Sequence, residues 1–140
     1  MSNPYGQVYL KNNLKRRTFM GKRRYRTYYI EKTVHPKWTN QIFLLDIPPE
    51  AVKTTRGYSV RVNIKDFQFL GGDNFLGQCD VQLNSLNHQN ETVGWFPLAA
   101  RTGKMFQRTS NEKVSGSVKL RLQWIHSTTR LLDYREDFLV

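Results

Sequence analysis

Three segments of the chain alternate apolar and polar residues with a period of two, and this pattern constrains the fold more than any other feature. The segments are residues 58–65, 78–83 and 117–124. Because successive side chains of a β-strand point to opposite faces, each segment predicts a strand with one buried face. The apolar positions are Val60, Val62 and Ile64 in the first segment, Cys79, Val81 and Leu83 in the second, and Val118, Leu120, Leu122 and Trp124 in the third.

Less regular candidates for strands occupy residues 5–10, 25–31, 41–47 and 94–98. The breaks between the candidates contain prolines and glycines, which favour turns, and no long amphipathic helical pattern separates them. Short strands joined by turns are typical of an antiparallel β-sandwich with two packed sheets. A length of 140 residues suits a single domain of this all-β class.

The positive charge of the chain is concentrated near its N-terminus. The net charge is +11, and the first 30 residues contain eight bases and no acid. Such a field is expected to form a face for an anionic membrane, an acidic protein or a nucleic acid. The chain has no apolar run long enough to span a bilayer, and its single cysteine favours a cytoplasmic location.

Residue patterns of catalytic and cofactor sites are absent from the sequence. The histidines lack Cys or Asp neighbours at metal-ligand spacing, Gly103-Lys104 lacks the rest of a phosphate-binding loop, and no G-x-S-x-G motif marks a nucleophile. Cys79 lies on the apolar side of its segment and is expected to be a small buried residue. We therefore expect a binding module without a cofactor, and not an enzyme.

Several short motifs occur in the order and spacing of a C2 domain. In chain order, Asn3-Pro4-Tyr5 resembles S-D-P-Y, residues 33–38 resemble T-x-N-P-x-W, residues 60–66 resemble V-x-V-x-D, residues 73–77 resemble D-D-F-L-G, residues 95–98 resemble W-x-x-L, and residues 116–124 resemble G-x-L-x-L. The resemblance implies a Greek-key C2 sandwich over residues 1–125 and a C-terminal tail over residues 126–140. With the G-x-L-x-L strand last, the chain is similar to the type II strand order.

The first strand of that order has no counterpart in this chain. The family has an apolar strand ending in A-x-x-L at this point, and only Met1 and Ser2 precede Asn3. Either the chain is a fragment cut inside its domain, or another segment fills the gap. The apolar tail from 131 to 140 is the nearest candidate, because open strand edges recruit strands. It is expected to pack on its own sandwich or on a second copy, and a strand-exchanged homodimer is slightly favoured because the tail follows the last strand directly.

The resemblance also locates the positions that hold calcium in other C2 domains. In this chain they are Asn3, Asp66, Gln68, Asp73 and Asn74, so only two carboxylates remain among them. Calcium prefers several charged oxygen ligands, and two carboxylates hold it poorly. These residues are therefore expected to act as ordinary turn residues, and the domain is expected to be independent of calcium.

Residues 22–28 resemble the basic strand of phosphoinositide-binding C2 domains, with Tyr28 in place of a second lysine. On a strand Arg24, Arg26 and Tyr28 would share a face, and arginine grips phosphate well. The loop at 67–72 would form the tip, whose apolar residues either insert into a membrane or fold back onto the core. The expected lipid-binding residues are Lys15, Arg16, Arg17, Lys22, Arg23, Arg24, Arg26, Tyr28, Phe69 and Leu70.

These features favour a calcium-independent C2 module that docks a larger cytosolic protein on anionic, phosphoinositide-containing membranes. The alternative function is a module that binds an acidic protein surface without lipid. The basic strand could also be a solvated charged face. Stacking of single-stranded nucleic acid on the tyrosines among the arginines is less favoured, because no nucleic-acid motif accompanies them.

Overall fold

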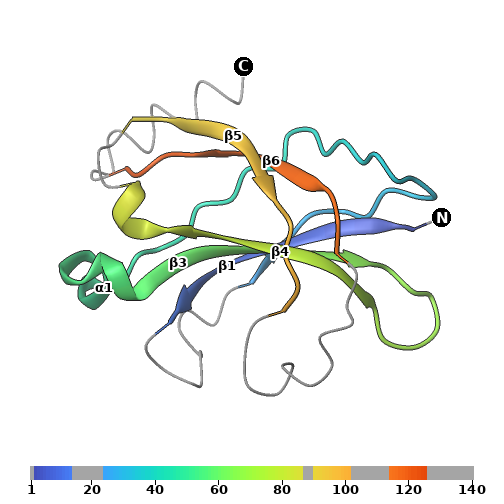
Figure 1. Ribbon diagram of the computed structural model, residues 1–140, viewed down its shortest axis with the longest axis horizontal. Coiled ribbons are helices and arrows are strands. Elements are labelled where there is room, and N and C mark those ends of the chain that lie inside the picture. Colours follow the sequence, from blue (N-terminus) through green and yellow to red (C-terminus); the bar gives the residue numbers. More distant parts are fainter. Residues whose placement is uncertain (1, 14–23, 87–89, 102–113, 126–140) are drawn as a thin grey trace.

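The computed structural model describes residues 2–13, 24–86, 90–101 and 114–125, which form a sandwich of antiparallel strands with little helix (Figure 1). The strands are β1 (Pro4–Asn12), β2 (Tyr25–Arg26), β3 (Tyr58–Asp66), β4 (Asn74–Gln82), β5 (Thr92–Pro97) and β6 (Ser117–Leu122). The helical elements are α1 (Pro49–Lys53) and two single turns of 3-10 helix, Thr55–Gly57 and Leu83–Ser85. No described helix has the length and apolar character needed to cross a bilayer.

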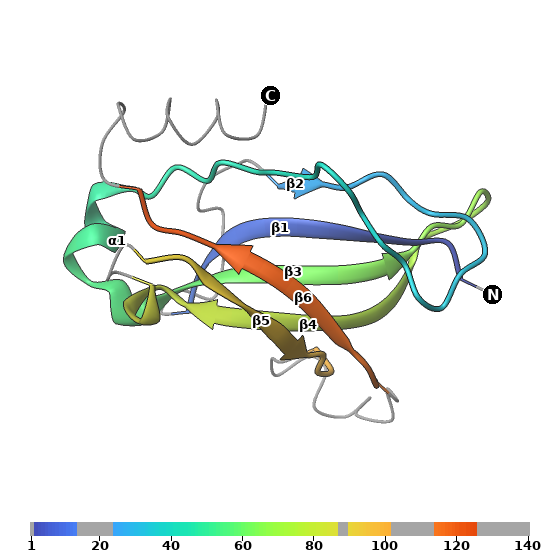
Figure 2. The ribbon, with the colours of Figure 1, turned by 90° about the horizontal axis from the view of Figure 1, so that it is seen from above.

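The first sheet has the strand order β2-β1-β3-β4, and every neighbouring pair is antiparallel. The long strand β3 lies between β1 and β4 (Figure 2). Val62 lies opposite Val8 of β1 and Cys79 of β4, so the apolar residues of the three strands line one face. The period of two in the sequence is therefore confirmed as the pattern of this sheet.

The second sheet contains only β5 and β6 among the described residues. Its inward residues include Phe96, Val118 and Leu120, which pack against the buried Val62 and Ile64 of the first sheet. Trp124, just beyond β6, is buried in the neighbouring part of the core. The antiparallel β-sandwich is thus confirmed, with its core between the two sheets.

Two expected strands differ in the structure. Residues 41–47 belong to no strand, although Leu45 and Ile47 pack on the core. The strand expected at 25–31 is reduced to β2, because the backbone N–H of Gly6 donates to the side-chain Oγ1 of Thr27 instead of to a backbone carbonyl. One bond of the ladder is replaced in this way at Thr27, while the N–H groups of Thr27 and Ile30 still donate to the backbone oxygens of Gly6 and Pro4.

The outer face of β3 is more buried than the alternating pattern predicts. Ser59, Arg61 and Asn63 lie on the polar side of the strand, and each is at most 8% exposed. Arg61 donates to Asp80 of β4 and Asn63 donates to the Tyr9 hydroxyl of β1, so polar partners are available on this side. The prediction of a half-buried strand was therefore wrong for β3. The outer side of this sheet, mainly over β1 and β2, carries the candidate functional site.

Candidate functional site

Two arginines at the edge of the first sheet lie flat on tyrosine rings of β1. The guanidinium carbon of Arg24 is 4.4 Å from the ring centre of Tyr9, and that of Arg26 is 4.5 Å from the ring centre of Tyr5. Both arginines are exposed, whereas both tyrosines are buried. Such stacking holds a cation over the sheet and leaves its N–H groups available to an anion.

The same face of the sheet carries two lysines close to these arginines. Lys65 of β3 lies opposite Tyr5, and Lys11 of β1 shares the outward side of its strand with Tyr9. We call Lys11, Arg24, Arg26 and Lys65 the cationic face. Burial and the nearby charge of Arg24 lower the pKa of Lys65, and burial and the charge of Arg61 lower the pKa of Lys11. Repulsion between like charges on this face would be relieved by a bound anion.

Arg61 lies beneath the cationic face and is held by Asp80 of β4. Its Nε and Nη2 atoms donate to the two carboxylate oxygens of Asp80 over 2.7 Å and 2.8 Å. Burial opposes its charge, but the hydrogen bond and charge of Asp80 raise the pKa of Arg61 overall. Arg61 is therefore a structural cation, since its fork is already filled by a carboxylate.

Two buried oxygens between the tyrosines have no hydrogen-bond donor among the described residues. They are Oε1 of Gln7 and Oδ1 of Asn63, whose residues stand opposite each other on β1 and β3. A buried acceptor without a donor is costly, so these positions favour an internal water molecule that donates to them.

The remaining carboxylates at the positions of calcium ligands are engaged in hydrogen bonds within the chain. Asp66 accepts from the backbone N–H of Asn3 over 2.8 Å and from Nε2 of Gln68 over 2.8 Å. Asp73 accepts from the Tyr5 hydroxyl and from the backbone N–H of Gln68. These bonds lower the pKa of Asp73. Hydrogen bonds thus occupy both carboxylates, and two of the donors, Asn3 and Tyr5, come from the distant N-terminal segment of the chain.

Asn3 and Asn74 complete the set of positions that correspond to calcium ligands. The side-chain oxygen of Asn3 accepts from the backbone N–H of Lys32 over 2.9 Å, and Asn74 is exposed. Within the described ranges, no three His, Cys, Asp or Glu side chains come together as metal ligands. Cys79 is buried as expected, and burial raises the pKa of its thiol to about 11.

The tip loop between β3 and β4 projects its apolar residues into solvent. Phe69 is 91% exposed and Leu70 is 88% exposed, so neither folds back onto the core. The base of the loop contacts the cationic face, because Asp73 bonds to Tyr5 and Arg26 stacks on that same ring. The charged and apolar parts of the site are therefore contiguous.

The other residues expected to bind lipid are placed as follows. Lys15, Arg16, Arg17, Lys22 and Arg23 lie outside the described residues. Tyr28 lies beyond the end of β2, and its hydroxyl accepts from the backbone N–H of Thr39 over 3.2 Å, which lowers its pKa. The structure therefore brings together Arg24 and Arg26, and it turns the Tyr28 hydroxyl toward the loop at residue 39.

Sequence reasoning missed the aromatic support of the site and its two lysines. Tyr5, Tyr9 and Lys11 stand at alternate positions of β1, a period-two signal that was available in residues 5–11. Lys65 follows the same rule on β3. What the pattern could not give is the pairing of β1 with both β2 and β3, which places arginines over tyrosines.

Comparison with known proteins identifies the family. A model of the C2 domain family matches residues 1–98. The chain belongs to the C2 domain family. Members of this family are generally binding modules for membranes and proteins.

Curated and solved relatives of this C2 domain agree with its fold. Human and mouse protein piccolo are each 27% identical over 77 residues, which is 55% of this chain but only 1% and 2% of the two relatives. The tandem C2 domains of extended synaptotagmin 2, solved with calcium bound, superpose with a TM-score of 0.62 at 21% identity, covering 97% of this chain and 41% of that one. A C2 domain of plant extended synaptotagmin 1 gives a TM-score of 0.58 at 12% identity, covering 89% of this chain and 81% of that one.

Proposed function

We propose that this C2 domain docks a larger cytosolic protein on anionic, phosphoinositide-containing membranes without calcium. The observation that carries the proposal is the pair of exposed arginines held flat on buried tyrosine rings. Among the described residues neither guanidinium has a carboxylate partner. The cation–π contacts fix the two charges in position while their donors stay open to phosphate.

A headgroup on the cationic face would be recognised by several positive charges held in fixed positions. Arg24 and Arg26 supply forks for phosphate, and Lys11 and Lys65 supply point charges beside them. Two fixed forks beside two point charges favour a headgroup that carries more than one phosphate over a single phosphate.

The exposed tip adds an apolar contribution to docking. Phe69 and Leu70 do not pack on the core of the domain. They therefore leave water only when they insert into a membrane or bind another protein surface. Transfer of each side chain into the acyl boundary contributes about 1.5–3 kcal/mol, and each base near an anionic leaflet contributes about 1 kcal/mol. The tip and the cationic face therefore contribute comparable free energies to membrane docking.

Calcium independence is supported by the chemistry of the loop end. Extended synaptotagmin 2 was solved with calcium bound. Here the two candidate carboxylates, Asp66 and Asp73, accept hydrogen bonds from neighbouring groups at all four oxygens. A calcium ion would have to displace those donors with too few charged ligands in return.

Vesicle co-sedimentation tests the proposed function. The full chain is mixed with phosphatidylcholine vesicles, with or without phosphatidylinositol bisphosphate, in calcium or in chelator. We expect binding that requires the phosphoinositide, weakens as salt rises and is equal in calcium and chelator. Binding that appears only with calcium would refute the calcium-independent mechanism. Failure to bind any anionic vesicle would refute lipid docking and leave the acidic protein surface as the partner.

A further inference from the structure

Lys65 stands between two aromatic rings, each of which carries an arginine. Its partners across the ladder are Tyr5 of β1 and Phe75 of β4, and β3 lies between these two strands (Figure 2). The guanidinium carbon of Arg26 lies 4.5 Å from the centre of the Tyr5 ring. That of Arg101 lies 4.4 Å from the centre of the Phe75 ring. Both arginines are exposed and Lys65 is half-buried, so three cations share one short row across the sheet.

Arg101 reaches this row because the chain that follows β5 joins the edge of β4. The backbone N–H groups of Gln78 and Ala99 donate to each other's carbonyl oxygens over 3.0 Å and 2.8 Å. This bridge is antiparallel, so the chain beyond Ala99 runs back along β4 toward Phe75. Arg101, two residues after Ala99, therefore comes level with the Phe75 ring on which it stacks.

The charges around Lys65 are mostly of its own sign. Burial lowers its pKa most, and three neighbouring arginines lower it further against one opposing carboxylate. The arginines are Arg24, Arg101 and Arg26, and the carboxylate is Asp73. The two oxygens of Asp73 already accept hydrogen bonds from the Tyr5 hydroxyl and the backbone N–H of Gln68. An anion placed above Lys65 would therefore be attracted by cations on both sides.

We propose that Arg26, Lys65 and Arg101 form a clamp for one phosphate monoester, an inference that deepens the proposed docking on phosphoinositides and rests on it. Neighbouring strands lie about 4.8 Å apart, so Tyr5 and Phe75 stand about 10 Å apart across β3. A phosphate above Lys65 accepts from an arginine on each side of it. We call these three residues the phosphate clamp.

The phosphate clamp distinguishes between two kinds of phosphate. A monoester has three strong acceptor oxygens and a charge of about −1.5 to −2 at pH 7. A diester, such as the group that links a lipid headgroup to glycerol, has fewer free oxygens and less charge. Three cations at separate positions match the oxygens of a monoester better. The phosphates on the ring of a phosphoinositide are monoesters, so the clamp makes binding depend on phosphorylation of the ring.

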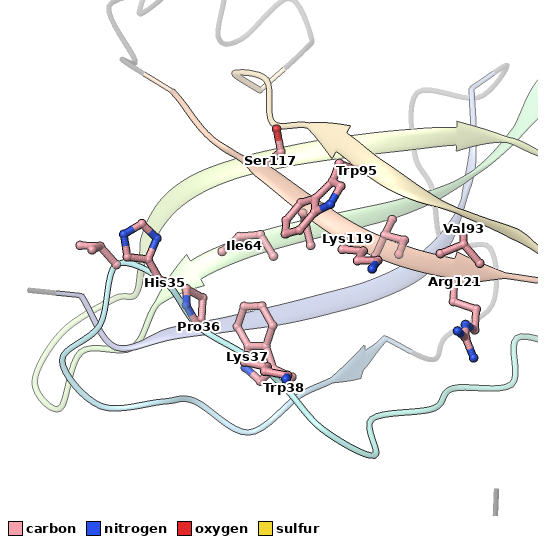
Figure 3. A pocket seen from close by; sticks show the side chains of 13 residues that line it. His35, Pro36, Lys37, Trp38, Ile64, Val93, Trp95, Ser117, Lys119 and Arg121 are labelled. Carbon is pink, nitrogen blue, oxygen red and sulfur yellow. The ribbon is translucent and has the colours of Figure 1, made fainter.

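A second group of cations, on the other sheet, provides a matched control. Lys37, Lys119 and Arg121 line a groove between the turn at residues 34–38 and strands β5 and β6 (Figure 3). Nε of Arg121 donates to Glu91 over 2.9 Å, so a carboxylate already occupies part of its fork. Arg121→Gln therefore removes one exposed arginine charge from the chain without altering the phosphate clamp.

Calorimetric titration of the full chain with soluble headgroups tests the phosphate clamp. The probes are inositol trisphosphate, which carries monoesters, glycerophosphoinositol, which carries only a diester, and inorganic phosphate. We expect the unaltered chain to bind the trisphosphate more tightly than either of the other two. Arg101→Gln should weaken trisphosphate binding about 10-fold or more, because a charge-assisted pair is lost. Arg121→Gln should bind like the unaltered chain.

Two further measurements separate binding from folding. The free energy of unfolding in urea should be similar for both variants, because both arginines are exposed. In the unaltered chain, the trisphosphate should shift the Nε–H nuclear magnetic resonance signals of Arg26 and Arg101 and leave that of Arg121 in place. An Arg101 signal that does not move would contradict the clamp without any substitution.

Three results of the titration would overturn the inference. If binding falls in Arg24→Ala with Arg26→Ala but not in Arg101→Gln, the proposed function stands and the clamp is wrong. Equal affinity for the trisphosphate and for the diester or inorganic phosphate would mean that the site does not select a headgroup monoester. If the unaltered chain does not bind the trisphosphate, the proposed phosphoinositide function fails together with the clamp.

Discussion

Removal of the apolar tip should weaken vesicle binding strongly without affecting the fold. Phe69 and Leu70 are 91% and 88% exposed, so nearly all of their apolar surface remains available for transfer into a membrane. At about 1.5 kcal/mol for each side chain, the lower end of the usual range, the pair contributes about 3 kcal/mol. Since about 1.4 kcal/mol is a tenfold change in an equilibrium constant, Phe69→Ala with Leu70→Ala should reduce vesicle partitioning about 100-fold.

The assay is partitioning of the full chain onto phosphoinositide vesicles, measured beside urea unfolding. The free energy of unfolding should change by no more than about 0.5 kcal/mol, because surface substitutions away from contacts have small effects. Val52→Ala is the matched control, since Val52 is 50% exposed on α1, at the end of the molecule away from the tip (Figure 1). Unchanged partitioning of the double variant would refute insertion of the tip.

Three further predictions concern the framework of the site. Asp80→Ala should lower the free energy of unfolding by about 2 kcal/mol in urea titration, because the buried Arg61 loses its carboxylate; an unchanged midpoint would contradict this. The pKa of Tyr5 is raised from 10.0 to about 12, so its contribution to stability is complete below pH 10 and is lost as pH rises through about 12; ultraviolet titration should show one late phenol that Tyr5→Phe removes. Gly77→Ala should destabilise the fold by about 1–3 kcal/mol, because an added Cβ would lie 2.8 Å from a side-chain atom, whereas Gly94→Ala, with nothing within 4 Å, is a control that should not.

Strands with a clean period of two could be predicted from the sequence. β3, β4 and β6 were expected because Val60, Val81 and Leu120 each belong to a run of alternating apolar residues, and all three pack in the core. The local pattern is sufficient there because the apolar residues of each strand pack in the core. The C2 resemblance added the order of the motifs and is confirmed by the family match.

Features that depend on pairing between distant segments could not be predicted. Residues 41–47 have a strand-like composition, but a strand also needs a neighbour with hydrogen-bonding groups, and none of the described residues pairs with them. β2 ends early because the Thr27 hydroxyl replaces a backbone acceptor. The strand propensities of these residues do not predict such a replacement. In the site, the charges of Arg24 and Arg26 were predictable, whereas their stacking on tyrosines depends on the sheet order.

The central claim of the proposed function is that the cationic face binds anionic lipid. One binding measurement tests this claim directly. Arg24→Ala with Arg26→Ala removes two bases worth about 1 kcal/mol each near an anionic leaflet, or about 2 kcal/mol together. Partitioning onto phosphatidylinositol bisphosphate vesicles should therefore fall about 30-fold. Arg56→Ala, which removes an exposed arginine beside α1, is the matched control and should bind like the unaltered chain. Equal partitioning of the double variant and the unaltered chain would contradict the account.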